Sequence, residues 1–474
     1  MINEYYKRHI VNGAIGIVAL IAITIFAATF LPSHEFHEMV LTYIEINHWI
    51  QRIIAIALLV IVWHLYQRKR FAWICTIVLL TASLILHFVL QYHPLSTVIV
   101  FFEGFALTLL LVGYSDFNRP IHRRYRVKTL PPDEKAKIRE LVLKYGQNPC
   151  SYLALEDDKI IFIGKKVEGI IAYGIVGNVI TICADPICAP NDFVQFLAEF
   201  KAFCAECSYE CIFLGTTNVF LKEYEMLGYS HVKSGEEAVF ELADYQLAGG
   251  KMAKLRTLIN HANKEVTTHE YKPADGKDIE VEKGINAVSR AWLEGKKSSQ
   301  LGFSVGGVGL NDPMDRRYFY AKDNNGKIVA FNVFLPYTCN PGIGYMADVT
   351  RRVPHAPGGV TEKLIYDGFM VFKEEGAKLG SMGQAPLANV HEDGIKDNMT
   401  VKIIEFIYEN CNKFYGFKDL HKAKEKYSPT LWAPGYFVFS TKNITPEMVF
   451  ASIKIQNPLG ITDYLLSSIR SILK

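Results

Sequence analysis

The sequence predicts a helical membrane region followed by an α/β region. Two observations support this prediction. Apolar runs of the length needed to cross a bilayer are confined to the first quarter of the 474 residues, and mixed helix and strand patterns fill the rest. Because the chain is too long for one ordinary domain, we expect three units, with boundaries at 1–127, 128–250 and 251–474.

Four apolar segments predict four transmembrane helices: Val11–Leu31, Ile50–Tyr66, Trp73–Leu90 and Leu95–Tyr114. Lysine and arginine precede the first segment, separate the second from the third and follow the fourth, but are absent from the loops 32–49 and 91–94. Cytoplasmic loops carry the excess of basic residues. We therefore expect both ends of the region, and everything after residue 119, to be cytoplasmic.

Two features of this region have alternative interpretations. Glu103 lies inside the fourth apolar segment, where an acid either contacts a lipid head group or makes a hydrogen bond between helices. The basic run 119–128 favours attachment to an anionic inner leaflet, although it also serves as the topological stop signal.

Residues 128–250 show a helix, a hairpin, a strand, a second helix and a buried strand, which is typical of a layered α/β domain. The expected elements are a helix over Pro131–Leu143, strands over Lys159–Gly164, Val167–Val176 and Val179–Ala184, a helix over Asn191–Ser208, and a strand over Cys211–Thr216, after which Tyr224–Gly235 ends the unit.

Residues 251–474 show a similar mixture of helix and strand patterns, which suggests a duplicated domain. The expected elements are helices over Lys251–Glu265 and Ile285–Glu294, a hairpin of Arg317–Lys322 and Lys327–Pro336 around Asn324-Asn325-Gly326, a strand over Ile343–Val349, a helix over Thr361–Gly376, a strand over Gly380–Ala385, a helix around Thr400–Cys411, and an amphipathic helix over Ile461–Lys474. This last helix either lies on the inner leaflet or docks on its own domain.

Composition narrows the classes of function. The net charge of +3 is concentrated before residue 128, so the remainder does not have the overall charge of a nucleic-acid-binding protein. Nine scattered cysteines indicate a reducing compartment. Cys204, Cys207 and Cys211 have a spacing that fits either a zinc site or a buried helix stripe, and without an accompanying histidine pair we favour the stripe.

The best candidate site lies at the end of the expected strand Ile343–Val349. Asp348 is followed by Arg351 and Arg352, then by a Pro/Gly-rich loop and a helix entrance. Arginine pairs grip phosphate bidentately, and an acid orients an amine or a hydroxyl. A surface ion pair at a turn is the alternative.

A second basic group lies on the helix expected over Lys251–Glu265. Arg256, Asn260 and Lys264 share one face of it, so this face either contacts phosphate or is simply solvated.

Several strings of the sequence, taken in order, resemble one known family. They are Gly235-Glu236-Glu237-Ala238, Arg256 with Asn260 and Lys264, Trp292-Leu293, Gly302-Phe303-Ser304-Val305-Gly306, Asp348-Val349-Thr350-Arg351-Arg352, Gly380–Leu387, Phe414-Tyr415-Gly416-Phe417 and Lys424-Glu425-Lys426-Tyr427-Ser428-Pro429. The ordered set resembles the phosphatidylglycerol lysyltransferases, which are aminoacyl-phosphatidylglycerol synthases of the multiple peptide resistance factor type.

The resemblance implies two tandem acetyltransferase-like (GNAT) domains in a bacterial plasma membrane protein. It also implies transfer of an amino acid, lysine first, from aminoacyl-tRNA to phosphatidylglycerol, which alters membrane charge and resistance to cationic peptides. The family's Asp-x-x-Arg signature falls on Asp348 and Arg351, which we expect to be catalytic. Its Lys-x-Lys signature falls on Lys424 and Lys426. Further expected substrate-binding residues are Arg352, Arg256, Lys264, Glu362 and Ser304.

The sequence departs from the family pattern at three positions. Glu362 replaces a usual aspartate, Gln384 stands where methionine is common, and Gln300 lies where an acid is expected. These changes leave the identity of the amino acid open.

The aminoacyl ester is already activated, so the reaction requires no metal or redox cofactor. The expected partners are aminoacyl-tRNA, phosphatidylglycerol, other membrane lipids and a separate lipid flippase, and a homo-oligomer is left open. The alternative functions are another acyltransferase acting on a lipid or cell-wall precursor, or an inactive membrane-tethered sensor or scaffold.

Overall fold

The computed structural model describes residues 4–28, 48–66, 68–89, 96–117, 130–295, 302–386, 388–390 and 417–457. The chain divides into two compact units. One comprises Met1–Arg126 with Phe203–Tyr209, and the other comprises Val127–Ala202 with Glu210–Lys474. The helices expected over Thr400–Cys411 and Ile461–Lys474 lie outside the described residues.

The N-terminal unit contains the helices α1 (Glu4–Ala28), α3 (His48–Tyr66), α4 (Arg70–Val89) and α5 (Ser96–Val112), which coincide with the four predicted apolar segments. Within the part of the chain that the structure describes, none of these helices combines the length and apolar character needed to cross a membrane, so the predicted crossings are not confirmed. The Ser83 hydroxyl of α4 donates a 2.8 Å hydrogen bond to Glu103 of α5. This bond favours the helix–helix interpretation of Glu103.

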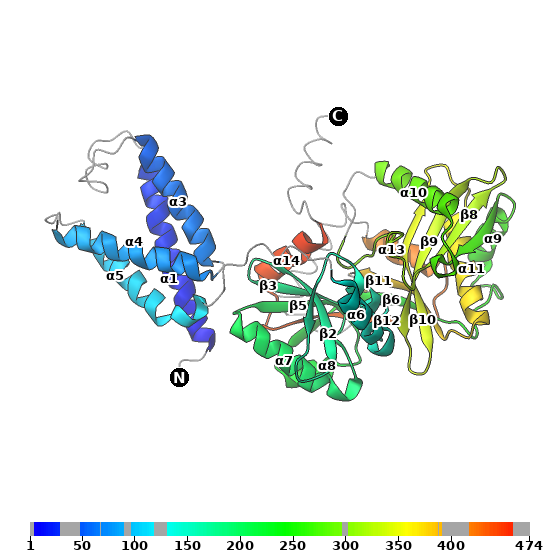
Figure 1. Cartoon of the computed structure of the whole chain (residues 1–474), viewed down its shortest axis with the longest axis horizontal. Helices are drawn as coiled ribbons and strands as arrows, with labels where there is room; N and C mark the ends of the chain where they lie inside the picture. The colour runs from blue at the N-terminus through cyan, green and yellow to red at the C-terminus, as the bar shows by residue number, and fades with distance from the viewer. Residues whose placement is uncertain are drawn as a thin grey trace. The chain divides into compact units, whose positions relative to one another are not determined.

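The second unit is built on a twelve-stranded sheet (Figure 1). Its strand order is β1-β2-β3-β5-β12-β6-β11-β10-β9-β8-β7, with β4 paired to β2. The strands are β1 (Ile160–Ile163), β2 (Gly169–Val176), β3 (Val179–Cys183), β4 (Ile187–Cys188), β5 (Glu210–Thr216), β6 (Ser230–Glu241), β7 (Val266–Tyr271), β8 (Arg317–Asp323), β9 (Ile328–Thr338), β10 (Ile343–Arg352), β11 (Leu379–Pro386) and β12 (Leu431–Phe439).

Only the pairs β3–β5 and β10–β11 are parallel; the other described strand pairs are antiparallel. Each parallel pair is connected through a helix, as parallel strands require. The sheet runs through the predicted boundary at residue 250 without a break, because β6 pairs with both β11 and β12. The division into two halves at that residue stays a prediction.

Helices cover both faces of the sheet (Figure 1). They are α6 (Pro132–Tyr145), α7 (Phe193–Glu206), α8 (Leu221–Met226), α9 (Ala253–Ala262), α10 (Ile279–Glu294), α11 (Val360–Glu374), α13 (Phe417–Glu425) and α14 (Pro446–Gln456), with short 3-10 turns that include η2 (Pro149–Leu155). Phe334 and Leu335 of β9 are neighbours, yet they pack into different cores because successive strand residues face opposite sides.

Most predicted elements are present within a few residues of their expected bounds. The Asn-Gly hairpin is confirmed: Gly326 has φ +77°, and Asp323 accepts the backbone N–H groups of Asn325 and Lys327. The helix expected from Ile285 instead begins at Ile279, because the Asp278 side chain caps it.

Two other expectations about elements are wrong. The strand expected to end at Val349 continues to Arg352, so both arginines lie within β10 and not in a turn. Cys204 lies in α7 but Cys211 lies in β5, so the three cysteines do not form one helix stripe. Among the described residues, no cluster of histidine, cysteine and acidic side chains could hold a metal ion.

Candidate active site

Asp348 lies at a β-bulge in the middle of β10. The pairing of β10 with β9 shifts register between Ala347 and Val349, which leaves Asp348 as the extra residue. The parallel pairing of β10 with β11 ends close by, at Met346 and Ser381. Bulges re-aim side chains and are frequent beside active sites. Here the bulge places the carboxyl group where the two strands separate.

The carboxyl group of Asp348 has few hydrogen-bond partners for its environment. The Gly306 backbone N–H donates a 3.2 Å hydrogen bond to Oδ1, and the solvent-shielded Oδ2 has no hydrogen-bond partner among the residues that the structure describes. Burial raises the pKa of Asp348 to about 6, against the opposing effect of the Gly306 N–H. An acid with a pKa near neutrality suits proton transfer at physiological pH.

The segment Gly302–Gly309 covers this carboxyl group and is held by three acids. Backbone N–H groups of Phe303, Gly306 and Gly307 donate to Asp158, Asp348 and Glu156, respectively. A Cβ atom added at Gly306 would overlap Oδ2 of Asp348, so glycine is required for this approach. Ser304 belongs to the same segment, and its backbone N–H donates to the Gly302 carbonyl.

Lys424 of α13 fills the gap beyond the end of the β10–β11 pairing. Its ammonium donates to the carbonyl oxygens of Gly383 and Gln384, at 2.7 and 2.6 Å. Burial lowers the pKa of Lys424 to about 7, and the charge of Glu237 opposes this shift. Burial raises the pKa of Glu237, which accepts a 2.5 Å hydrogen bond from the Ser381 hydroxyl.

Cys150 of η2 lies next to the bulge and is affected by the charges of Asp348, Lys424 and Glu237. Its sulfur lies 3.9 Å from the Met346 sulfur, next to the bulge. Burial raises the pKa of the Cys150 thiol, and the charges of Glu237, Asp348 and Lys424 act on it as well. The charges of Asp348, Lys424 and Glu237 therefore all act on this one buried thiol, although the sequence places the three residues far apart.

Arg351 lies on β10 but is covered by α10. It is only 4% exposed, donates a hydrogen bond to the Ser289 hydroxyl, and lies 4.8 Å from the ring centroid of Trp292. Burial lowers the pKa of Arg351, and the charge of Asp348 opposes this shift. The interpretation of Arg351 as a member of a surface ion pair is wrong, because its guanidinium is buried beside the acid.

Lys426 and Glu362 face each other away from this group. Lys426 Nζ lies 3.8 Å from Glu362 Oε1, and Glu362 also accepts from the Thr361 hydroxyl. Arg352, at the end of β10, is exposed. Within the described part of the chain, no hydrogen bond or ion pair joins these three residues to the Asp348 carboxyl group, and their roles in binding stay predictions.

The basic face expected on the helix after residue 250 is only partly formed. Arg256 of α9 donates to the backbone carbonyls of Leu247 and Gly249, which is a structural role. The helix ends at Ala262, so the exposed Lys264 lies beyond it. These observations do not test whether Arg256 or Lys264 binds phosphate.

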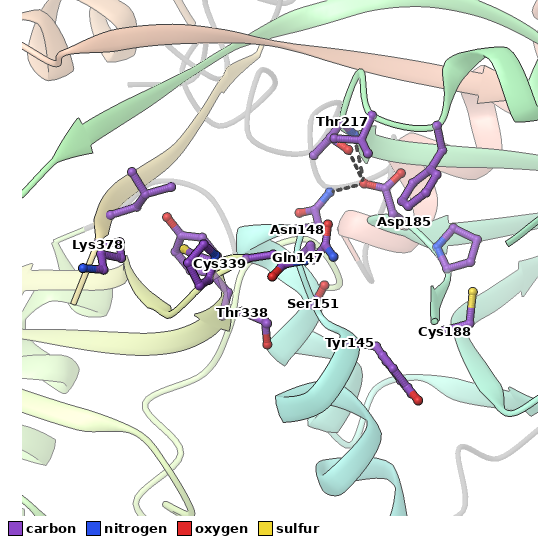
Figure 2. Close-up of a pocket in the computed structure, with 17 residues that line it drawn as sticks. Tyr145, Gln147, Asn148, Ser151, Asp185, Cys188, Thr217, Thr338, Cys339 and Lys378 are labelled. Carbon is purple, nitrogen blue, oxygen red and sulfur yellow. Dashed lines mark hydrogen bonds between the residues drawn. The ribbon is translucent and has the colours of Figure 1, made fainter. Parts of the chain in front are cut away.

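The first half of the sheet has an acid in the matching place, which we did not predict. The β3–β5 pairing ends at Cys183 and Leu214, and Asp185 follows Cys183 by two residues, as Asp348 follows Met346. Both acids are preceded by alanine, but Ala-Asp also occurs at 243–244 and 274–275, so this pair alone did not single out Asp185 in the sequence. Asp185 lines a cavity of about 450 Å³ together with Asn148 and Thr217 (Figure 2).

Comparison with known proteins identifies the family. The family model for the C-terminal part of phosphatidylglycerol lysyltransferase matches residues 139–439. The chain belongs to this family. A phosphatidylglycerol lysyltransferase of Staphylococcus haemolyticus is 26% identical over 351 residues, which cover 74% of this chain, and one of Bacillus subtilis is 28% identical over 318 residues, which cover 66%.

Solved structures support the fold. The L-PGS of Bacillus licheniformis matches with a TM-score of 0.58 and 25% identity, over 72% of this chain and 97% of that one. A C-terminal domain from Agrobacterium fabrum shares the fold at a TM-score of 0.56 and 23% identity, over 65% of this chain and 92% of that one. The region after the N-terminal unit therefore has the fold of these two structures, and its expected description as GNAT-like stays a prediction.

The match with the lysyltransferases covers only part of those proteins. The chain spans 40% of the length of the Staphylococcus haemolyticus relative and 36% of the Bacillus subtilis relative. The matched part includes Asp348, Lys424 and Glu237.

Proposed function

We propose that the chain transfers an amino acid, with lysine as the first candidate, from aminoacyl-tRNA to a glycerol hydroxyl of phosphatidylglycerol. The observation that carries this proposal is the shielded Oδ2 of Asp348, which has no hydrogen-bond partner among the described residues and lies within the region matched to the lysyltransferase family. A carboxylate oxygen without a partner is available to a substrate hydroxyl.

The reaction needs one proton carrier. The lipid hydroxyl oxygen bonds to the ester carbonyl carbon, and the bond between that carbon and the tRNA ribose oxygen breaks. Asp348 Oδ2 accepts the proton of the attacking hydroxyl and returns it to the departing ribose oxygen. A pKa of about 6 leaves Asp348 ionised at pH 7 but still able to hold the proton transiently.

The neighbouring cations stabilise the negative charge that develops on the ester oxygen and the charge of the substrate phosphates. Lys424 is held in place by two carbonyl oxygens, and the charge of Glu237 favours its protonated form against the effect of burial. Arg351 is fixed by Ser289 and Trp292, so its charge acts from a constant position. Positioning of this kind supplies much of the rate in transfer from an activated ester.

The proposal includes location and partners. The basic run 119–128 and the four apolar helices support attachment to the cytoplasmic face of a bacterial plasma membrane, where phosphatidylglycerol is present. Export of the product would fall to a separate flippase, and altered membrane charge would then change resistance to cationic peptides.

A reconstituted assay tests this function. The purified full chain in detergent is incubated with phosphatidylglycerol vesicles and lysyl-tRNA carrying radiolabelled lysine. We expect label in the lipid fraction, and no label when ribonuclease is added first or when phosphatidylethanolamine replaces phosphatidylglycerol. Alanyl-tRNA in a parallel reaction tests the choice of amino acid. Absence of lipid label with every aminoacyl-tRNA offered would overturn the proposal.

A further inference from the structure

The cavity in the first half of the sheet lies next to the candidate active site. Its wall is formed by the ends of β3 and β5, by η2 and by the β9–β10 hairpin. Asp185 in this wall acts electrostatically on Glu237, and Glu237 acts on Tyr337, another residue of the wall. Geometry gives the link: Asn148 donates to the Gly215 carbonyl, and a Cβ atom added at Gly215 would lie 3.3 Å from the Gln384 side chain. The Gln384 carbonyl accepts from Lys424, so the cavity lies close to Lys424.

The hydrogen bonds around Asp185 determine what Thr217 presents to the cavity. Oδ2 of Asp185 accepts from Asn148 Nδ2 at 2.8 Å, from the Thr217 backbone N–H at 2.9 Å and from the Thr217 hydroxyl at 3.0 Å (Figure 2). Because the Thr217 hydroxyl hydrogen points to Asp185, only the lone pairs of Thr217 Oγ1 remain for a ligand. The cavity therefore offers an acceptor backed by a buried negative charge.

Asn148 does not offer a second acceptor or donor to a ligand in the cavity. Its Nδ2 donates to both Asp185 and the Gly215 carbonyl, and its Oδ1 accepts from the Cys150 backbone N–H. These bonds use its donors and orient Thr217 and Asp185. Among the described lining residues the only other ionic side chain is Lys378, which is exposed and lies far from Asp185 in the view of Figure 2.

We infer that this cavity is a second ligand site, in which Thr217 Oγ1 accepts a hydrogen bond from a primary ammonium group and Asp185 compensates its charge. An ammonium group has three donors and no acceptor, so it matches a hydroxyl that can only accept. A buried carboxylate favours a cation over a neutral alcohol. An amino acid side chain of the size of lysine fits a volume of about 450 Å³.

This inference rests on the proposed function, because that function supplies an aminoacyl group as the source of the ammonium. The ammonium is either the side-chain group of lysine or the α-amino group shared by all aminoacyl esters. L-lysinamide and L-norleucinamide separate these sources, because they share the α-amino group and only lysinamide has the ε-ammonium.

The test is calorimetric titration of both probes into the full chain in detergent. We expect lysinamide to bind, Thr217→Val to weaken its binding by about tenfold or more, and Thr217→Ser to leave it nearly unchanged. Serine keeps the hydroxyl and valine keeps the shape, so the pair isolates the hydrogen bond. Asp185→Asn should weaken the same binding, with thermal unfolding of each variant as the check on folding.

The outcomes are distinct. If lysinamide binds tightly and norleucinamide binds weakly, the site recognises the side-chain ammonium. If both probes bind equally and their binding depends on Thr217, the site recognises the α-amino group. Both results support the inference. Binding that is the same in the wild type, Thr217→Val and Asp185→Asn overturns it, as does no binding of either probe. The titration measures binding and does not require aminoacyl transfer. A protein that binds lysinamide through Thr217 but labels no lipid would therefore refute the proposed function and leave this inference standing.

Discussion

Replacing Asp348 with asparagine should abolish product formation while making the protein more stable. The pKa of Asp348 is about 6 in the folded chain, against an ordinary aspartate value of 3.8. The folded state thus holds its proton more tightly than the unfolded state. Above pH 6 the burial of this charge costs about two pKa units, or about 3 kcal/mol.

The pH dependence gives the sign of the effect. At pH values below the pKa of Asp348 in the unfolded chain, the carboxyl group is protonated in both the folded and the unfolded state, and its burial costs no stability. The cost grows as the pH rises towards the folded-state pKa and is constant above it. The Asp348→Asn variant should therefore exceed the wild type in free energy of unfolding by about 3 kcal/mol at pH 8 and by about 1.5 kcal/mol at pH 5. Urea denaturation followed by tryptophan fluorescence measures this difference.

A matched control lies on α11. Asp367 forms a partly exposed ion pair with Lys363 at 2.8 Å, and such pairs contribute less than about 1 kcal/mol. Asp367→Asn should leave product formation unchanged and shift stability little at either pH. If Asp348→Asn is less stable than the wild type at pH 8, the carboxylate is not held at a cost in free energy, and its assignment as the proton acceptor loses its physical basis.

Three further changes test the surroundings of the site. Gly306→Ala should lower product formation in the lipid-labelling assay on the order of a hundredfold, because its Cβ atom would displace Asp348 Oδ2. Gly307→Ala is the control: its Cβ atom would lie 3.6 Å from its nearest neighbour, so this variant should retain activity. Lys424→Met should also lower labelling on the order of a hundredfold with helix content retained by circular dichroism; unchanged labelling would remove Lys424 from the site. Arg317→Ala should cost about 1–2 kcal/mol of stability, because it removes the ion pairs of the buried Arg317 with the partly exposed Glu270 and the exposed Glu375. A denaturation midpoint equal to that of the wild type would contradict this.

The sequence was sufficient for elements whose apolar pattern matches their burial. Strands such as β3 and β5 and helices such as α6 and α11 were predicted within a few residues. The long strand β6 was missed because it carries Lys233, Glu236 and Glu237 in its interior. Those charges are buried against partners such as Ser381, which no local pattern reveals.

The candidate site was predicted in part. The resemblance to the family picked out Asp348 and Lys424, but the bulge that aims Asp348 and the burial that lowers the pKa of Lys424 depend on strand pairing between distant segments. Glu237 appeared in the sequence only as part of a family string, and Asp185 was not among the predicted site residues. Their proximity to the site follows from the sheet order, in which β6 adjoins β11 and β12.

The most direct test of the central claim is lipid mass spectrometry on cells that express the full chain or its Asp348→Asn variant. We predict a phosphatidylglycerol species heavier by one lysine residue with the wild type, and none with the variant at equal protein level. Equal amounts of that species with both proteins would contradict the role of Asp348. Its absence with both, while each protein is present and folded, would contradict aminoacyl transfer to phosphatidylglycerol itself.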